Sequence, residues 1–342
     1  MPKAKPLALT IGEPAGIGPD LTLALWRHRA EVDLPAFYLV GSADFLKRRA
    51  QALGIDVAIA EVEPAQAVST FARAVPVAPL DLPMTAAPGK PDDSSAPAAI
   101  ASIRRAVDDV MSGQAAAVVT NPIAKNVLTR AGFGEPGHTE FLGKLAQAKT
   151  GKPVTPVMML WSPGLAVVPV TIHIPLRKVF SALSTALIVN TGRIVARDLS
   201  ARFGIARPRL AIAALNPHAG EEGTLGDEDK TIVAPAVKQL QADGIDATGP
   251  LPADTMFHER ARQNYDAALC MYHDQALIPI KTLAFDHGVN VTLGLPFVRT
   301  SPDHGTAIDL AGTGKANPGS LLAALRLAAR LTANAPALVP AK

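Results

Sequence analysis

The sequence of 342 residues is poor in several residue types, and each shortage excludes a class of protein. It has a single cysteine, Cys270, so an internal disulfide and a cysteine-based zinc site are both excluded. Charged residues make up 18% of the chain, below the ~25% of ordinary domains. The net charge is only +3, and there is no run of like charge. A dedicated nucleic-acid-binding protein and a disordered chain are therefore not expected.

Long hydrophobic runs are also missing. Lys3 and Lys5 precede only a short apolar run at residues 7–11, too short for the core of a signal peptide. Residues 157–176 carry no Asp, Glu, Lys or Arg, but Ser162-Pro163-Gly164 interrupts this stretch and two further prolines follow. We expect a strand, a turn and a second strand there, and no membrane span. The sequence thus predicts a cytoplasmic protein with no membrane partner.

What the sequence does contain is an alternation of apolar strand-like runs and helical patterns. Strands are expected at residues 7–11, 37–40, 116–120, 157–160, 166–172, 210–215, 267–271 and 289–293. Helices are expected at residues 20–29, 43–53, 96–111, 123–131, 187–203, 230–242 and 320–332, the third of them capped by Ser95. Residues 75–94 are rich in proline and are expected to be irregular.

This alternation predicts an α/β fold with a mostly parallel sheet and helices on both faces. The length suggests two lobes. Because no linker separates them, we expect one intertwined unit, with approximate lobes formed by residues 1–135 plus 285–342 and by residues 136–284.

Three of the eight histidines share one setting. His173, His218 and His273 each stand at or just past the end of an apolar run of the buried-strand type. In open α/β sheets the carboxyl ends of the strands form the edge where ligands bind. Three imidazoles gathered there would hold a divalent metal and leave one position open. The alternative is that each is an ordinary strand-end histidine bonded to the backbone, and the residues alone do not decide between the two.

Two acidic residues are candidates to join such a site. Asp254 precedes Thr255 and would serve equally well as a helix N-cap. Asp274 directly follows His273 and would orient its imidazole.

Two turns have the composition of anion sites, although a tight strand-to-helix connection without a ligand is the preferred interpretation of the first. Gly12-Glu-Pro-Ala-Gly-Ile-Gly-Pro-Asp follows the first strand and opens a helix, and Gly137-His-Thr-Glu-Phe opens another, with Thr139 as its expected cap. Thr120-Asn-Pro-Ile-Ala-Lys125 is a third strand-to-helix junction. Further along, Lys281 and Arg299 would neutralise a phosphate, and the alternative is that they are ordinary surface charges. Their neighbours are apolar residues and glycines, a setting that favours the wall of a cleft.

At this point the motifs resemble those of a known family. The segment from His304 to Pro318 is similar to the adenosine-binding loop of isocitrate and isopropylmalate dehydrogenases. The remaining motifs resemble the 4-hydroxythreonine-4-phosphate dehydrogenases of pyridoxal 5′-phosphate biosynthesis. They are Gly12-Glu-Pro-Ala-Gly-Ile-Gly-Pro-Asp, Gly137-His-Thr-Glu-Phe, Leu215-Asn-Pro-His-Ala-Gly-Glu, Gly249-Pro-Leu-Pro-Ala-Asp-Thr, Met271-Tyr-His-Asp-Gln and the stretch from Gly288 to Ser301. They follow one another along nearly the whole chain, and together they are highly specific.

The resemblance implies a two-lobed fold of the isocitrate and isopropylmalate dehydrogenase type and a reaction. The family oxidises the 3-hydroxyl of 4-phosphooxy-L-threonine with NAD or NADP, and the product loses CO₂ to give 3-amino-2-oxopropyl phosphate. It works as a homodimer whose active site lies between the lobes and is completed by the partner subunit. Its three metal-binding histidines match His173, His218 and His273. The family's metal site is associated with zinc, magnesium or cobalt.

The resemblance also implies the ligand residues. The family's substrate residues match His138, Thr139, Lys281, Asn290 and Arg299, and its cofactor loop places His304, Gly312, Gly314 and Asn317 near the adenosine. A divalent metal would stabilise charge on the oxygen that is oxidised. The proton acceptor is not assigned, and Asp254 is the first candidate. The pair Glu221-Glu222 departs from the commoner glycine-rich form of its loop.

Two alternatives stay open. A paralogue of the same fold would oxidise 4-phospho-threonate or phospho-erythronate, which lack the amino group. An acyltransferase of the phosphate acetyltransferase type shares the broad fold but needs neither a nicotinamide nor a three-histidine metal site.

Overall fold

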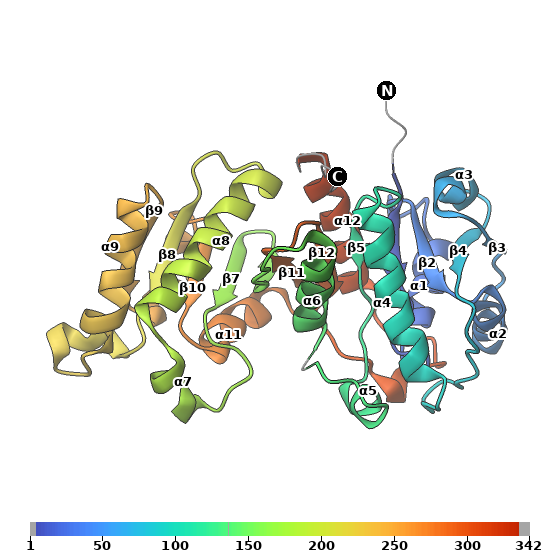
Figure 1. The fold of residues 1–342 in the computed structure, drawn as a ribbon, viewed down its shortest axis with the longest axis horizontal. Coiled ribbons are helices and arrows are strands. Elements are labelled where there is room, and N and C mark those ends of the chain that lie inside the picture. Colours follow the sequence, from blue (N-terminus) through green and yellow to red (C-terminus); the bar gives the residue numbers. More distant parts are fainter. Residues whose placement is uncertain (1–4, 136, 335–342) are drawn as a thin grey trace. The chain divides into compact units, whose positions relative to one another are not determined.

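The computed structural model describes residues 5–135 and 137–334, which fall into two compact units (Figure 1). Unit 1 contains the chain up to Pro156 and the segment from Leu295 to Ala333, and unit 2 contains Val157–Gly294. Each unit is an α/β sandwich, so the expected fold class is confirmed.

Unit 1 begins with β1 (Leu7–Thr10), α1 (Gly18–Arg27), β2 (Phe37–Gly41), α2 (Ala43–Leu53), β3 (Ile59–Glu61), α3 (Ala67–Phe71), β4 (Val75–Pro79) and α4 (Ser95–Met111). It continues with β5 (Val118–Val119), α5 (Lys125–Arg130) and α6 (His138–Thr150), and the later segment adds β12 (Arg299–Pro302) and α12 (Gly319–Asn334). The strands lie in the order β3-β4-β2-β1-β5-β12, and all these pairs are parallel. One face of this sheet is covered by α4 and α6, whose Ile103, Val107 and Phe141 share a buried cluster with Tyr38 and Val40.

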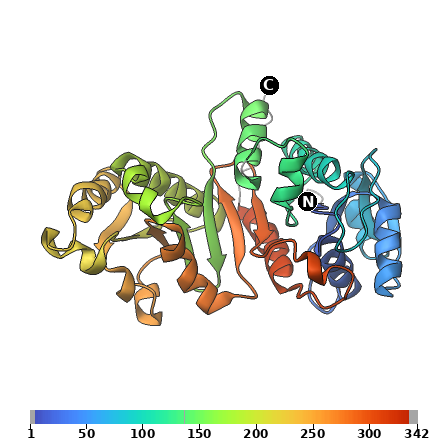
Figure 2. The same ribbon diagram turned by 90° about the horizontal axis from the view of Figure 1, so that it is seen from below.

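Unit 2 contains β6 (Val157–Ser162), β7 (Leu165–Pro169), α7 (Leu176–Ala182), α8 (Thr185–Phe203), β8 (Arg209–Ala213) and α9 (Ala234–Ala242). It ends with β9 (Asp246–Leu251), α10 (Glu259–Arg262), β10 (Ala267–Cys270), α11 (His273–Ala284) and β11 (Val289–Leu293). The strand order is β11-β6-β7-β10-β8-β9. β6 pairs antiparallel with both β11 and β7, and Figure 2 shows the β6–β11 pair as adjacent green and orange arrows. The remaining pairs are parallel.

The structure differs from the sequence-based expectations in a few places. The segment 75–94 is not irregular throughout, because β4 forms at its start and pairs with both β2 and β3. Ser94, not Ser95, is the N-cap residue of α4, while the Ser95 side chain accepts a hydrogen bond from the amide of Asp92. Helix α6 belongs to unit 1, not to the lobe expected for residues 136–284, because Phe141, Leu142 and Ala146 complete the cluster around α4.

Two further features bear on the sequence analysis. Cys270 is fully buried, and burial raises the pKa of its thiol, which makes it an unreactive core residue.

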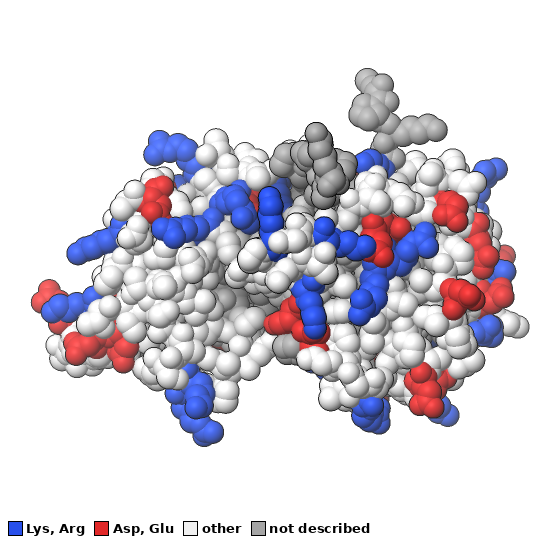
Figure 3. Space-filling model, in the orientation of Figure 1, with Lys and Arg blue, Asp and Glu red and all other residues white. Residues whose placement is uncertain are grey.

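On the face that Figure 3 shows, Lys, Arg, Asp and Glu side chains are scattered over each unit among mostly uncharged atoms. Within the described residues, no single helix is long and apolar enough to cross a membrane; α7 and α8, bent by 92° at their junction, pass the length and composition test only as a pair.

Candidate active site

The three candidate metal ligands follow three neighbouring strands of unit 2. β7, β10 and β8 are parallel and adjacent, so their carboxyl ends lie at one edge of the sheet. His173 comes four residues after β7, His273 is the first residue of α11, and His218 comes five residues after β8. The topology therefore places all three at the edge that the sequence predicts for ligands.

His173 and His273 lie together at this edge. Their ring centroids are 5.6 Å apart. Nδ1 of His273 is 2.7 Å from Oδ1 of Asp274, an interaction that orients the ring and leaves Nε2 as the ring nitrogen for a metal. Both rings line a cavity of about 270 Å³, together with Thr171, Ile174, Leu176, Val179, Tyr272 and Asp274. Asp274 thus has the orienting role expected from the sequence.

His218 lies in an unusual turn. From His218 to Glu222 the backbone stays in the left-handed region, with φ of 52° at His218 and 58° at Glu222. His173 also has a φ of 52°. Left-handed backbone costs roughly 1–2 kcal/mol for each non-glycine residue and is concentrated at functional sites. Two of the three candidate ligands therefore carry the same local strain.

The described residues of one chain do not complete a metal cage. In the part of the chain that the structure describes, no three His, Cys, Asp or Glu side chains are arranged to hold a metal ion. His173 and His273 are brought together, and His218 is not part of their group. The prediction of a three-histidine site stays a prediction.

Unit 1 provides a cationic site at the start of α6. Gly137 is the N-cap residue of α6 in place of the expected Thr139, and a glycine has no side chain to cover the first amides. His138 and Thr139 occupy the first turn, beside Arg299 of β12. Burial of the His138 ring, together with the positive charges of Arg299 and Lys125, holds the pKa of His138 well below its usual range. His138 is therefore a neutral imidazole, and Nε2 is buried with no hydrogen-bond partner among the described residues.

Arg299 is the most deeply placed cation of this group. Its side chain is 2% exposed, and Nη2 donates a 2.6 Å hydrogen bond to Oγ1 of Thr120. Burial lowers the pKa of Arg299 to about 9. Helix amides that no side chain caps, a neutral imidazole and a buried guanidinium form an environment suited to an anion. The sequence reading assigned no role to Lys125, although it ends the third strand-to-helix junction singled out there.

The other two expected substrate residues belong to unit 2. Lys281 lies in the last turn of α11, with Nζ 5.3 Å from the centroid of the Phe285 ring. Asn290 lies on β11 opposite Leu160 of β6. Its Oδ1 is buried and has no hydrogen-bond partner within residues 5–135 and 137–334. A buried amide oxygen of this kind is available to a ligand donor.

The expected cofactor loop is attached to the first glycine turn of unit 1. The amide of Gly312 donates a hydrogen bond to Oδ2 of Asp20, and the amide of Ile17 donates to the carbonyl of Thr306. Gly312 has a φ of 76°, and a Cβ there would lie 2.7 Å from Cβ of Pro88, so only glycine fits. Gly314 is left-handed as well, Asn317 Oδ1 accepts from the amide of Gly319 at the start of α12, and Nδ1 of His304 lies 2.9 Å from the carbonyl of Gly305.

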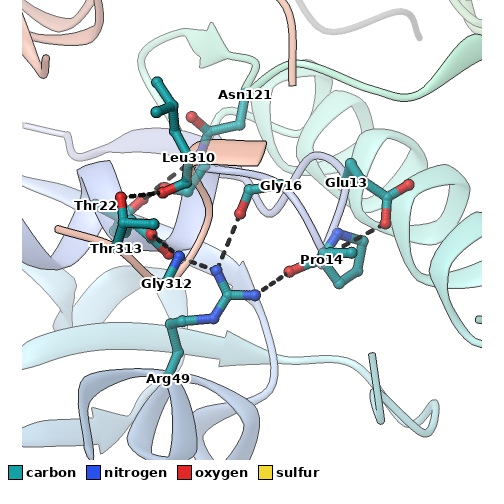
Figure 4. Close-up of polar contacts among 12 residues, drawn as sticks. Glu13, Pro14, Gly16, Thr22, Arg49, Asn121, Leu310, Gly312 and Thr313 are labelled. Atoms are coloured by element: carbon teal, nitrogen blue, oxygen red, sulfur yellow. Dashed lines mark hydrogen bonds and ion pairs between the residues drawn. The ribbon is translucent and has the colours of Figure 1, made fainter. Parts of the chain in front are cut away.

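Arg49 binds both the glycine turn and Asp20 at this junction. It forms a buried ion pair with Asp20 and donates to the carbonyls of Gly16 at 3.0 Å and Pro14 at 2.6 Å (Figure 4). The guanidinium thereby fixes the shape of the glycine turn, while its carboxylate partner fixes Gly312. Asp254, by contrast, is exposed in a short turn at Ala253–Thr255 in unit 2.

Comparisons with known proteins agree with these observations. The sequence model of the family described as "Pyridoxal phosphate biosynthetic protein PdxA" matches residues 33–328. The chain belongs to this family. It is 65% identical over 338 residues to a 4-hydroxythreonine-4-phosphate dehydrogenase of Bradyrhizobium diazoefficiens, covering 96% of this chain and 98% of that relative.

The solved structures give the same result. The chain matches the 4-hydroxythreonine-4-phosphate dehydrogenase of Klebsiella pneumoniae with a TM-score of 0.86 and 39% identity, covering 96% of this chain and all of the other. A phosphotransacetylase of Staphylococcus aureus matches with a TM-score of 0.51 at 12% identity, over 94% of each chain, which shows a shared fold alone. The family resemblance and the expectation of an oxidoreductase in pyridoxal phosphate biosynthesis are confirmed.

Proposed function

We propose that this PdxA-family protein oxidises 4-phosphooxy-L-threonine with NAD or NADP to 2-amino-3-oxo-4-phosphooxybutanoate. That product then loses CO₂ to give 3-amino-2-oxopropyl phosphate. The observation that carries the proposal is the candidate anion site of unit 1, where buried Arg299 and neutral His138 lie at the N-terminus of α6, which no side chain caps. A substrate with a phosphate and a carboxylate needs such a site.

The proposed substrate residues divide between the two units. In unit 1, Arg299 binds an anionic group of the substrate by its planar fork, and His138 and Thr139 donate hydrogen bonds without adding charge. In unit 2, Lys281 supplies a second cation and Asn290 a buried amide. Two cations match the two anionic groups of a phosphorylated amino acid. The adenosine of the cofactor is assigned to the loop that carries His304, Gly312, Gly314 and Asn317.

The proposed metal ligands are His173, His218 and His273. The donors fit a divalent cation, because two imidazoles lie together beside a cavity and Asp274 fixes the tautomer of one of them. Zinc, magnesium and cobalt are the metals considered; nitrogen donors favour zinc or cobalt over magnesium. When bound, the metal would stabilise negative charge on the substrate oxygen during oxidation. Asp254 is the proposed proton acceptor.

A second copy of the chain is the proposed partner. The apolar side chains of unit 2 that lie most open to solvent are on or beside α7 and α11, next to His173 and His273. Leu176 is 64% exposed, Phe180 53%, Ile278 63% and Phe285 72%. Exposed apolar groups of this size mark a surface that is covered in the working protein. A homodimer would cover them and complete the site with residues of the partner subunit. The charged substrate and nucleotide do not cross a bilayer unaided, so the cytoplasm is the proposed location.

The experiment is an absorbance assay of NADH or NADPH formation with 4-phosphooxy-L-threonine. It is run on metal-loaded and on chelated enzyme, with phospho-D-threonate in parallel. Metal-dependent turnover that favours the amino substrate is expected. Turnover of phospho-D-threonate alone would contradict the proposed substrate, and absence of reduction with either compound in folded, metal-loaded protein would contradict the proposed reaction.

A further inference from the structure

The end of β10 is a junction of hydrogen bonds that links the strands carrying the candidate metal ligands. The register between β10 and β8 ends at the pair Leu269–Ile212. Beyond it, the two segments continue to His273 and His218. At this point the side chain of Gln275 bridges them.

Gln275 uses both ends of its amide. Its Oε1 accepts a hydrogen bond of 2.7 Å from the amide of Met271, just after β10. Its Nε2 donates a hydrogen bond of 2.7 Å to the carbonyl of Ala214, just after β8. The side chain is only 8% exposed. The Gln275 side chain thus links the segments that follow β10 and β8, just beyond the last backbone pair of these strands.

Thr171 makes the corresponding link on the other side of β10. Its Oγ1 donates a hydrogen bond of 2.7 Å to the carbonyl of Met271, in addition to a longer one of 3.3 Å that its backbone amide donates to the same carbonyl. Thr171 is 5% exposed and lies two residues before His173. Met271, which is fully buried and lies two residues before His273, therefore binds Gln275 through its amide and Thr171 through its carbonyl.

The β8 side is held once more before His218. The buried carboxylate of Asp229 accepts from the amide of Leu215 at 2.7 Å and from the amide of Asn216 at 2.9 Å. With the carbonyl of Ala214 bound by Gln275, three consecutive residues ahead of Pro217 and His218 have a backbone group held by a buried side chain. This anchorage precedes the left-handed turn described above.

We propose that Gln275 is a positioning residue for the metal site, because it sets the separation of the strand ends that lead to His218 and His273. Thr171 contributes in the same way to the separation of the strand ends that lead to His173 and His273. The inference rests on the proposed metal-dependent function. A second copy related by two-fold symmetry has the same frame, so the positions of the donors from both copies depend on it.

The chemistry of the side chain is specific to this role. Glutamine offers a donor and an acceptor at a fixed separation, which a backbone amide and a backbone carbonyl require. A glutamate at this position would still accept from the amide of Met271, but it would present an oxygen to the carbonyl of Ala214 and push the strand ends apart. A methionine fills a similar volume and makes neither bond.

The test compares Co²⁺ binding by the full-length protein, stripped of metal and titrated while the visible absorption of bound Co²⁺ is followed. Gln275→Met and Thr171→Val should raise the Kd for Co²⁺ by about 10- to 100-fold, the usual effect of removing a residue that orients metal ligands. The bound-state spectrum should change as well. The matched control is Gln241→Met, which removes a similar 2.8 Å side-chain bond, to the carbonyl of Ala247, on a part of unit 2 that carries no candidate ligand.

Thermal unfolding of the metal-free proteins separates positioning from stability. The inference requires weaker Co²⁺ binding in Gln275→Met than in Gln241→Met at comparable metal-free stability. Equal binding in the two variants would overturn it while leaving the proposed function intact. A wild-type protein that binds no Co²⁺ would overturn the metal site and the inference together. If Gln275→Met does not fold, Gln275→Glu and Thr171→Val provide the same comparison.

Discussion

The carboxylate of Asp20 accepts a 2.6 Å hydrogen bond from the backbone amide of Gly312, 292 positions further along the chain. The same carboxylate pairs with Arg49, and both side chains are almost fully buried. A buried ion pair with further hydrogen bonds to backbone groups here joins the first turn of unit 1 to the loop assigned to the nucleotide. Its role is to keep distant segments together, which is a stronger reason for its presence than stability alone.

Replacing Asp20 by Asn should therefore be costly. It leaves the guanidinium of Arg49 buried without its counter-charge, a change that costs about 3–5 kcal/mol of unfolding free energy. Urea denaturation measures this loss. The control is Asp44→Asn, which removes an exposed pair with Lys47 on the neighbouring α2 and should cost less than about 1 kcal/mol. Similar losses in both variants would contradict the role of the buried pair.

The lowered pKa of His138 predicts a dependence of stability on pH. The folded protein keeps this ring neutral below the ordinary pKa of 6.5, while the unfolded chain takes up a proton there. More protons are then bound in the unfolded state, so stability falls as pH drops below 6.5, by up to about 1.4 kcal/mol per pH unit, until the lowered pKa is reached. His138→Gln should lose part of this slope between pH 7 and pH 5. Urea titrations at the two pH values measure it, with the exposed His287→Gln as the control.

Arg299 offers a test of the anion site. Arg299→Lys keeps a cation but loses the planar fork and the bond to Thr120. We expect kcat/KM for the phosphorylated substrate to fall by about 100-fold or more, since a misplaced charge loses about 3 kcal/mol or more of charge-assisted bonding. The KM for the nucleotide should change little. A fall confined to the nucleotide KM would place Arg299 outside the substrate site.

The left-handed turn at His218–Glu222 predicts a stabilising change. Glu222 is exposed and has a φ of 58°, which glycine adopts without strain. Glu222→Gly should raise the unfolding free energy by up to about 1 kcal/mol, the relieved strain less the added freedom of the unfolded chain. Glu259→Gly, in the right-handed helix α10, should lower it by a similar amount. Urea denaturation of both variants shows whether the two signs differ.

The sequence predicts those elements whose signal is local. The helices α4, α8 and α12 have long apolar periodicity and lie within two residues of their expected bounds. The sequence does not predict β4, because Pro76 and Pro79 are poor strand residues. Pairing with both β2 and β3 nevertheless keeps this segment in the sheet. The sequence does not predict α11 either, because Pro279 lies inside the helix. Ile278 and Leu283 are exposed, which breaks the apolar periodicity of the helix.

The residues of the candidate site also differ in how far the sequence predicts them. His173, His218 and His273 could be singled out because each follows a recognisable strand, whereas the contact of only the His173 and His273 rings and the left-handed turn at His218 have no local signal in the sequence. Gln275 and Lys125 both stand in motifs quoted from the sequence, but their roles could not be found from their neighbours in sequence. Gln275 acts on a carbonyl 61 positions away, and Lys125 acts on His138 through space.

The insertion of unit 2 into unit 1 has a consequence for how the protein is made. Synthesis releases the chain from its N-terminus, and domains generally fold as units as they emerge. The strands of unit 2 all come from Val157–Gly294, so its sheet is able to close as soon as that segment is released. Unit 1 must wait with β5 as an open edge until Arg299–Pro302 arrives to pair with it. The second part of the protein to be translated is thus the first that is able to finish folding.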